Sequence, residues 1–328
     1  MARSATPLTP VAPVAADAAA ATAAASGATA TATAATAISA SATARHWPGF
    51  GLLRRLFRDK PLGAAGAVIC AIFLFCGVFA DVLAPYGVNE INMLHRLQAP
   101  SWAHPFGTDN LGRDMLSRCL YGAQLSVVIG LSAATLATAV SVLLGILTGY
   151  LGGKFDLVAQ RFVDAWMSFP DLVILIVVVS VLGPGSWQIV VTLGLLLGIG
   201  GSRIVRSAVV SVRENMYVHA AQSMGASTPR ILWRHILPNV LPPVIVLFTT
   251  RVGTAILAES GLSFLGLGVP PPAPTWGGML SGDGRTFMFQ GPWLALAPGA
   301  CLTVVVYAIN VYGDALRDLL DPRMRGTR

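Results

Sequence analysis

Residues 217–243, with the sequence YVHAAQSMGASTPRILWRHILPNVLPP, form a polar segment rich in small residues between two long apolar stretches. Charged residues make up only 11% of the chain, yet this segment and the residues leading into it are basic. A structured basic segment between two apolar stretches is expected to contact another protein. The segment contains Arg230 and Arg234, and the residues leading into it contain Arg203, Arg206 and Arg213.

The composition on either side of this segment is that of a membrane protein. The chain has 328 residues, of which 54% are hydrophobic and only 15 are acidic. A soluble domain of this length would have about a quarter of its residues charged, so much of this surface is expected to face lipid. The apolar runs are continuous rather than alternating, which favours membrane-spanning helices over the strands of a barrel.

The apolar runs predict an all-α membrane protein with six transmembrane helices in residues 46–328. A short turn is expected between the second and third spans, and the polar segment corresponds to a loop at 213–238. Residues 1–45 are Ala/Thr/Ser-rich and predict a disordered low-complexity tail, which a start codon placed too early would also explain. The spans are expected at about 62–84, 123–150, 165–183, 187–205, 239–259 and 292–313.

The distribution of basic residues predicts the orientation of these helices. Seventeen of the 22 lysine and arginine residues fall in the segments on the side of residues 1–60. Because basic residues concentrate in cytoplasmic loops, both termini and the 213–238 loop are expected in the cytoplasm of a multi-pass inner-membrane protein. The net charge of +7 therefore reflects topology, and no nucleic-acid partner is expected.

The polar segment predicts two short helices. Residues 217–225 read as one helix whose small residues, Ala220, Ala221, Gly225 and Ala226, would allow close approach of another backbone. Gly225 suits either a tight contact or a helix C-cap. A second helix would start at Thr228, as N-cap, with Pro229 in its first turn, and end at Pro238. The alternative is a helix lying on lipid headgroups, but small residues favour docking.

Several strings carry a resemblance to a known family. The small residues, Gly225 and the Ile-Leu-Pro at 236–238 resemble the signature loop of inner-membrane permease subunits of binding-protein-dependent ABC importers. Other strings resemble the dipeptide, oligopeptide and nickel branch, and the similarity covers about residues 54–323. They are FGTDNLGRDMLSRCLYGA (106–123), SFPDLVILI (168–176), AESGLSFLGLGVPPPAPTWGGML (258–280) and NVYGDALRDLLDPR (310–323).

The resemblance implies the type I ABC importer permease fold and a set of partners. These are a paralogous permease subunit, two ATPase subunits that carry ATP and magnesium, and an extracytoplasmic binding protein. The 217–237 segment would couple to the ATPase through His219, Ala220, Ala221, Gly225, Ala226, Arg230, Arg234 and Pro238. The family motif usually opens Glu-Ala-Ala, whereas this chain has His219, which would make any charge pairing there depend on pH.

Other residues are candidates for the solute path or for outer contacts. Arg251 inside the fifth span indicates a lined cavity or a charge pair, unless it snorkels to the interface. Glu259 could face an outer vestibule, and Ser263 and Phe264 lie in a string, 262–268, that could form a re-entrant gate or simply pack. Asp109, Arg113 and Asp114 precede the second span and would either contact the binding protein or cap local structure.

The remaining motifs narrow the function. There is no GxxxxGK[ST] loop to hold ATP, so no cofactor or metal is expected on this chain itself. Its four cysteines form no CxxC pair. A membrane protease would need HExxH or GxSG, and neither occurs. The leading hypothesis is a non-enzymatic permease importing di- or oligopeptides. The alternatives are import of nickel or another small solute on the same scaffold, or a secondary transporter, although intramembrane carboxylates are scarce.

Overall fold

The computed structural model describes residues 49–320, so the predicted tail at 1–45 lies outside the described residues. Contacts divide the chain at Leu52, and the described residues from Leu53 to Leu320 form one packed helical unit. A short 3-10 helix (Met93–His95) and a π-helical turn (Leu232–Ile236) accompany the α-helices. The α-helices are α2 (Gly49–Asp59), α3 (Pro61–Val78), α4 (Ala80–Leu83), α5 (Met115–Leu151), α6 (Gly153–Met167), α7 (Asp171–Leu182), α8 (Ser186–Arg213), α9 (Met216–Ser223), α10 (Thr228–Ile231), α11 (Leu237–Phe264), α12 (Trp276–Ser281), α13 (Asp283–Thr286) and α14 (Trp293–Leu320).

Five helical stretches of the described chain are long and apolar enough to cross a membrane. They correspond to the first, second, fourth, fifth and sixth predicted spans, and most are longer than predicted. α5 already begins at Met115, because Asp114 caps its first turn by accepting from the Ser117 amide. α8 continues to Arg213 and so carries three arginines on its last turns. The stretches are Pro61–Val78, Met115–Leu151, Ser186–Arg213, Thr228–Phe264 and Trp293–Leu320.

The third predicted span, 165–183, is not one helix. Its first residues belong to α6, which begins at Gly153 where the sequence indicated only a turn, and its remainder is α7. The two helices are bent by 83° at the break. Pro170 explains the bend, because a residue before proline avoids the α conformation, so the helix ends before it. α7 has only 12 residues, so the pair together replaces a single straight span.

α5 and α8 pack closely through reciprocal glycine notches. A Cβ atom at Gly145 would lie 2.6 Å from the Cβ of Val205, and one at Gly198 would lie 2.7 Å from the Cβ of Val140. The Ser141 hydroxyl adds a hydrogen bond of 2.7 Å to the Gly198 carbonyl across the same contact. Gly149 of α5 and Gly194 of α8 lie in the same contact, each four residues from the glycine named above, as in small-xxx-small helix packing.

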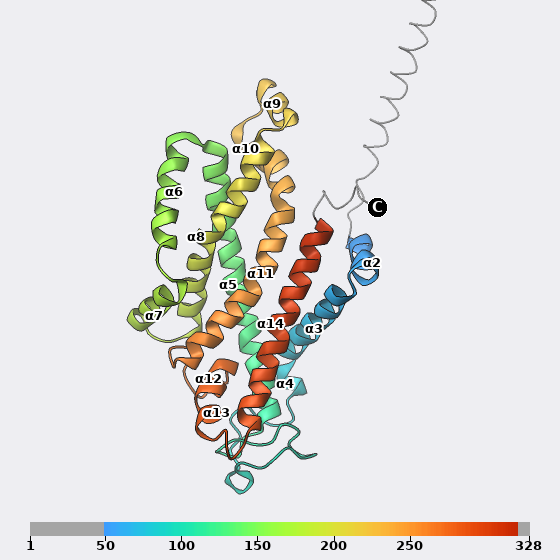
Figure 1. Ribbon diagram of the computed structural model, residues 1–328, viewed down its shortest axis with the longest axis vertical. Helices are drawn as coiled ribbons and strands as arrows, with labels where there is room; N and C mark the ends of the chain where they lie inside the picture. The colour runs from blue at the N-terminus through green and yellow to red at the C-terminus, as the bar shows by residue number, and fades with distance from the viewer. Residues whose placement is uncertain (1–48, 321–328) are drawn as a thin grey trace, which may run out of the picture. The chain divides into compact units, whose positions relative to one another are not determined.

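The elements that connect these helices gather at the two ends of the bundle (Figure 1). α9 and α10 lie at one end, here called the α9 end, and α4, α12 and α13 lie at the opposite end, here called the α12 end. α3 and α14 pack on each other along one side, where Gly66 of α3 faces the Ala308 carbonyl of α14. Only 28% of the span residues of α3 and of α14 are buried within this chain, so both leave apolar surface for lipid or another subunit.

Candidate functional site

The α9 end is built on the last turns of α5 and α8. The guanidinium of Arg213 donates to the carbonyls of Gly149 (3.4 Å) and Tyr150 (3.0 Å) at the end of α5. The side-chain amide of Asn215 donates to the Val212 carbonyl at 3.0 Å, which satisfies the end of α8. The Arg213 bonds join the end of α8 to the end of α5, and the Asn215 bond ties the residue that precedes α9 back to α8.

α9 is amphipathic in a way that the sequence analysis did not anticipate. Val218 and Ala221 are buried against the core formed by α8 and α11, so Ala221 faces inward rather than out to a partner. Ala220 is exposed and lies between Met216 and Met224, whose exposed fractions are 87% and 82%. These three residues are spaced four apart and form one exposed stripe, called the Met–Ala–Met stripe below.

Gly225 ends α9 with a Schellman motif. The Ala226 amide donates to the Ala221 carbonyl at 3.0 Å, and the Gly225 amide donates to the Gln222 carbonyl at 2.9 Å. Gly225 has φ of +77°, a conformation that is strained for residues with a Cβ. Of the two roles considered for Gly225, the structure supports the C-cap. Ala226 is half-buried against the neighbouring core.

The second short helix differs from the expectation at both of its ends. Ser227, not Thr228, occupies the N-cap position, and Thr228 already belongs to α10. Pro238 does not end the helix: the π-helical turn Leu232–Ile236 leads directly into α11, and Pro238 lies in the first turn of α11. A proline is tolerated there because the first amides of a helix have no partner inside the helix.

The basic residues of this segment point away from the core. Arg230 and Arg234 are exposed, as is Trp233, while Ile231 and Ile236 are buried. His219 is also exposed, and its Nε2 atom lies 4.0 Å from a carboxylate oxygen of Glu214. A hollow of about 450 Å³ beside them is lined by Tyr150, Leu151, Arg213, Glu214, His219 and Gln222. The chain thus places a carboxylate of its own, Glu214, beside His219.

Arg251 lies halfway along α11, next to the contact between α5 and α8. Its guanidinium approaches the Gly201 notch of α8, and its Nε atom is buried without a hydrogen-bond partner among the described residues. Asp171, in the first turn of α7, supplies the neighbouring negative charge. Arg251 therefore lies beside the packed helices, and its role as part of a lined cavity or of a charge pair stays a prediction.

Glu259 does not face an open vestibule. It is 1% exposed, accepts a hydrogen bond of 2.6 Å from the Ser263 hydroxyl, and has the Ser260 hydroxyl 3.4 Å away. The Glu259 carboxylate is therefore hydrogen-bonded within α11, because Ser260 and Ser263 follow it by one and four residues. Ser263 is buried with it, whereas Phe264 is exposed.

The 262–268 string does not form a separate gate segment. α11 runs on to Phe264, and the chain then turns at Gly266, where φ is +81°. The segment that folds back is α12, whose Gly277 lies against the Ser260 carbonyl. The Trp276 indole donates to the Cys119 carbonyl at 3.1 Å, which fixes α12 between α5 and α11.

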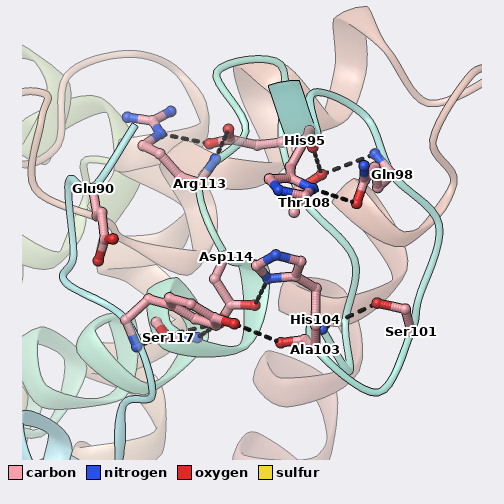
Figure 2. Close-up of polar contacts among 12 residues, drawn as sticks. Glu90, His95, Gln98, Ser101, Ala103, His104, Thr108, Arg113, Asp114 and Ser117 are labelled. Carbon is pink, nitrogen blue, oxygen red and sulfur yellow. Dashed lines mark hydrogen bonds and ion pairs between the residues drawn. The ribbon is translucent and has the colours of Figure 1, made fainter. Parts of the chain in front are cut away.

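The loop before α5 is held by buried polar side chains (Figure 2). Asp109 is 1% exposed and accepts from the Arg113 side chain at 2.6 Å and from the Leu111 and Arg113 amides. Asp114 accepts from the Ser117 amide at 2.7 Å and contacts the His104 ring at 2.9 Å. Both carboxylates are hydrogen-bonded within the loop, which favours the capping role over direct contact with a binding protein.

This cluster also joins the loop to α13. An Arg113 nitrogen lies 3.3 Å from a carboxylate oxygen of Asp283, 170 residues away in sequence. Burial raises the pKa of Asp283; the nearby Asp109 raises it further, whereas Arg113 and Arg118 lower it. Sequence spacing gives no sign of this long-range pair. Among residues 49–320, no group of three His, Cys, Asp or Glu side chains is arranged to hold a metal ion.

Comparisons with known proteins agree with this architecture. Residues 141–326 match the family described as binding-protein-dependent transport system inner membrane component. Residues 50–100 match the N-terminal TM domain of oligopeptide transport permease C. In solved structures, the chain resembles the MetNI methionine ABC transporter in inward-facing conformations, with a TM-score of 0.52 and 17% identity over 63% of this chain and 98% of that chain. This likeness supports the fold alone.

Curated relatives are similar over most of their length. The dipeptide transport system permease protein DppC of Alkalihalophilus pseudofirmus is 41% identical over 83% of this chain and 89% of its own. The oligopeptide transport system permease protein OppC of Bacillus subtilis is 37% identical over 82% of this chain and 88% of its own. A putative peptide permease protein of Brucella suis is 42% identical over 79% and 86%. The chain therefore belongs to the family of binding-protein-dependent transport system inner membrane components.

Proposed function

We propose that this chain is a membrane-spanning subunit of an ATP-driven importer of dipeptides or oligopeptides. The Met–Ala–Met stripe on α9 is the observation that carries the proposal. Two methionines and an alanine stand exposed on a short helix whose other face is buried. Flexible methionine side chains suit a hydrophobic docking groove, and the small Ala220 between them allows close approach of the partner.

The partner at this surface is a separate ATPase subunit that binds ATP and magnesium. Arg230 and Arg234 are exposed on the segment that follows the stripe and supply positive charge for an electrostatic contact with that partner. His219 and Glu214 lie beside each other at this surface, with the histidine Nε2 atom 4.0 Å from a carboxylate oxygen, and contribute polar groups to the contact. The chain itself contributes movement and a path for the solute, and no covalent chemistry.

The complete transporter contains more than this chain. The apolar sides of α3 and α14 that its own fold leaves uncovered are available to a paralogous permease subunit and to lipid. A second ATPase docks on that paralogue, and an extracytoplasmic binding protein delivers the solute at the α12 end. The exposed tips of that end include Leu94, Trp102 and Phe289, and such side chains are suitable anchors for a protein contact.

The orientation follows from charge. The α9 end carries most of the arginines and lysines, so it lies in the cytoplasm of the inner membrane, together with both termini. Transport then proceeds by alternating access. ATP-driven closure of the ATPases moves α9, and Arg213 and the Gly145–Val205 contact pass that movement to α5 and α8, which open toward one side or the other. Peptides are proposed as the solute because the relatives named above are peptide permeases.

Uptake by the reconstituted complex tests the proposal. This chain, its paralogue and the ATPases are placed in proteoliposomes with the binding protein, and entry of radiolabelled alanyl-alanine is followed with and without ATP. We expect uptake only with ATP and binding protein. Uptake that is driven by a proton gradient without ATP would contradict the proposal, and uptake of nickel with no uptake of any peptide would contradict the choice of solute.

A further inference from the structure

A cavity between α8, α11 and α14 has no assigned role. Its volume is about 500 Å³, within the range of about 300–1,000 Å³ that small-molecule sites occupy. It lies toward the α9 end, on the first half of α11 and the last turns of α14. Its wall includes Ile204 of α8, Pro242, Pro243, Val246 and Thr250 of α11, and Arg317 of α14.

Most of this wall is apolar, and it carries one charge. Arg317 lies in the last turn of α14 and is exposed. The neighbouring Asp318 is engaged by Lys60, at 2.7 Å, and no carboxylate of the described residues forms an ion pair with Arg317. A guanidinium at the rim of an apolar cavity is suited to a carboxylate, which it can bind with two parallel hydrogen bonds.

Pro242 and Pro243 line the cavity and interrupt the hydrogen-bond ladder of α11 beside it. A helix carbonyl points to the amide four residues further on, and proline has no amide hydrogen. The carbonyls of Pro238 and Asn239 therefore point to the rings of Pro242 and Pro243 without a donor there. In a membrane-spanning helix such carbonyls are satisfied by neighbouring helices, Ser or Thr side chains or ordered water, so the prolines mark a part of α11, next to the cavity, that needs polar partners.

We infer that this cavity is a transit site for the imported peptide, with Arg317 at its rim binding the peptide carboxylate. The inference rests on the proposed function and adds a site to it. Val246 and Ile204 provide apolar walls that tolerate varied side chains. Binding at such a site must be weak enough to release the solute, and a single charged partner meets that requirement.

Substitutions in the reconstituted complex test the role of Arg317. We expect Arg317→Gln to lower the maximal rate of alanyl-alanine uptake about tenfold, because a charge-assisted contact is lost. Arg317→Lys should recover part of it. The matched control is Arg161→Gln, which removes an exposed arginine on α6 whose Asp164 partner is 3.5 Å away. Equal uptake by Arg317→Gln and the wild type would overturn the inference.

Filling the cavity gives a second, independent readout. Val246→Trp should block uptake while the complex still hydrolyses ATP, whereas Val181→Trp, on the exposed side of α7, should leave both unchanged. In a chain with its native cysteines replaced by serine, Val246→Cys should react with a charged thiol reagent, and alanyl-alanine should slow the reaction.

Two other occupants are distinguished by the same variant. If Val246→Cys reacts only with a lipid-soluble reagent, an acyl chain fills the cavity. If Val246→Cys cross-links to the paralogous subunit, the cavity is part of a subunit interface. Either result overturns the transit site. If the wild-type complex imports no peptide at all, the proposed function fails first. If the wild type imports peptide and these variants do so equally well, only the cavity assignment fails.

Discussion

Single polar residues hold the outer loop in place, and most of them lie in positions that look accessible in sequence. Asp109 and Asp114 precede a long apolar helix, as contact residues would, yet both carboxylates are buried and bonded within the loop. The capping role of Asp114 was predictable, because an aspartate three residues before a helical serine is a typical N-cap. The link from Arg113 to Asp283 was not, since it depends on how α13 folds back.

Asp283 gives this cluster a measurable dependence on pH. Because burial raises its pKa, the folded protein binds this proton more tightly than the unfolded chain does. Its contribution to stability is therefore present below the ordinary carboxyl pKa and is lost as pH rises through the raised value. Asp283→Asn cannot ionise, so we expect its unfolding temperature, relative to the wild type, to increase between pH of about 4 and 7.

Thermal unfolding of both proteins in detergent, followed by tryptophan fluorescence, measures this difference. The prediction is contradicted if the unfolding temperature of Asp283→Asn falls relative to that of the wild type as pH rises, or lies below it at neutral pH. Either result would show that pairing with Arg113 affects the stability of the ionised carboxylate more than burial does. Asp81→Asn, a variant of an exposed carboxylate on α4, controls for the general effect of removing one negative charge.

At the scale of helices, apolar run length predicted the existence of the spans and missed their shapes. The apolar run at 165–183 predicted one straight span, although it contains Pro170. The structure has an 83° bend there, between α6 and α7. Likewise the composition of 217–225 indicated a helix with a docking face but not which face is buried. Ala221 turns inward because Val218, one turn away, is buried in the core of α8 and α11.

The contact between α5 and α8 depends on glycine. Gly198→Ala would place a methyl group 2.7 Å from the Cβ of Val140 and 3.0 Å from the Ala137 carbonyl, and we expect it to destabilise the protein by about 1–3 kcal/mol. Gly261→Ala is the matched control, because that glycine also lies inside a helix and its Cβ would meet nothing within 4 Å.

Chemical denaturation in detergent measures both variants, and Gly261→Ala should equal or exceed the stability of the wild type. A Gly198→Ala protein as stable as Gly261→Ala would mean that α5 and α8 separate more easily than their packing indicates.

At the scale of the whole molecule, this fold is one part of a larger assembly. α3 and α14 are mostly unburied in their span regions, and the α9 end presents apolar side chains to water. Lipid can cover the span regions of α3 and α14, whereas the exposed methionines of the α9 end lie on a connecting segment outside the five apolar stretches. Family membership and charge distribution could be predicted from the sequence. The Met–Ala–Met stripe could not, because no sequence motif shows that Met216 and Met224 are exposed rather than buried.

The affinity of the ATPase for the permease pair tests the central claim most directly. Purified ATPase is titrated onto nanodiscs that contain this chain and its paralogue, with the double variant Met216→Ser and Met224→Ser compared with Met93→Ser and Met288→Ser, two exposed methionines elsewhere. Loss of buried apolar area at each methionine should weaken binding by about tenfold or more. We expect that loss for the stripe variant alone. Equal affinity for both variants would contradict docking through α9.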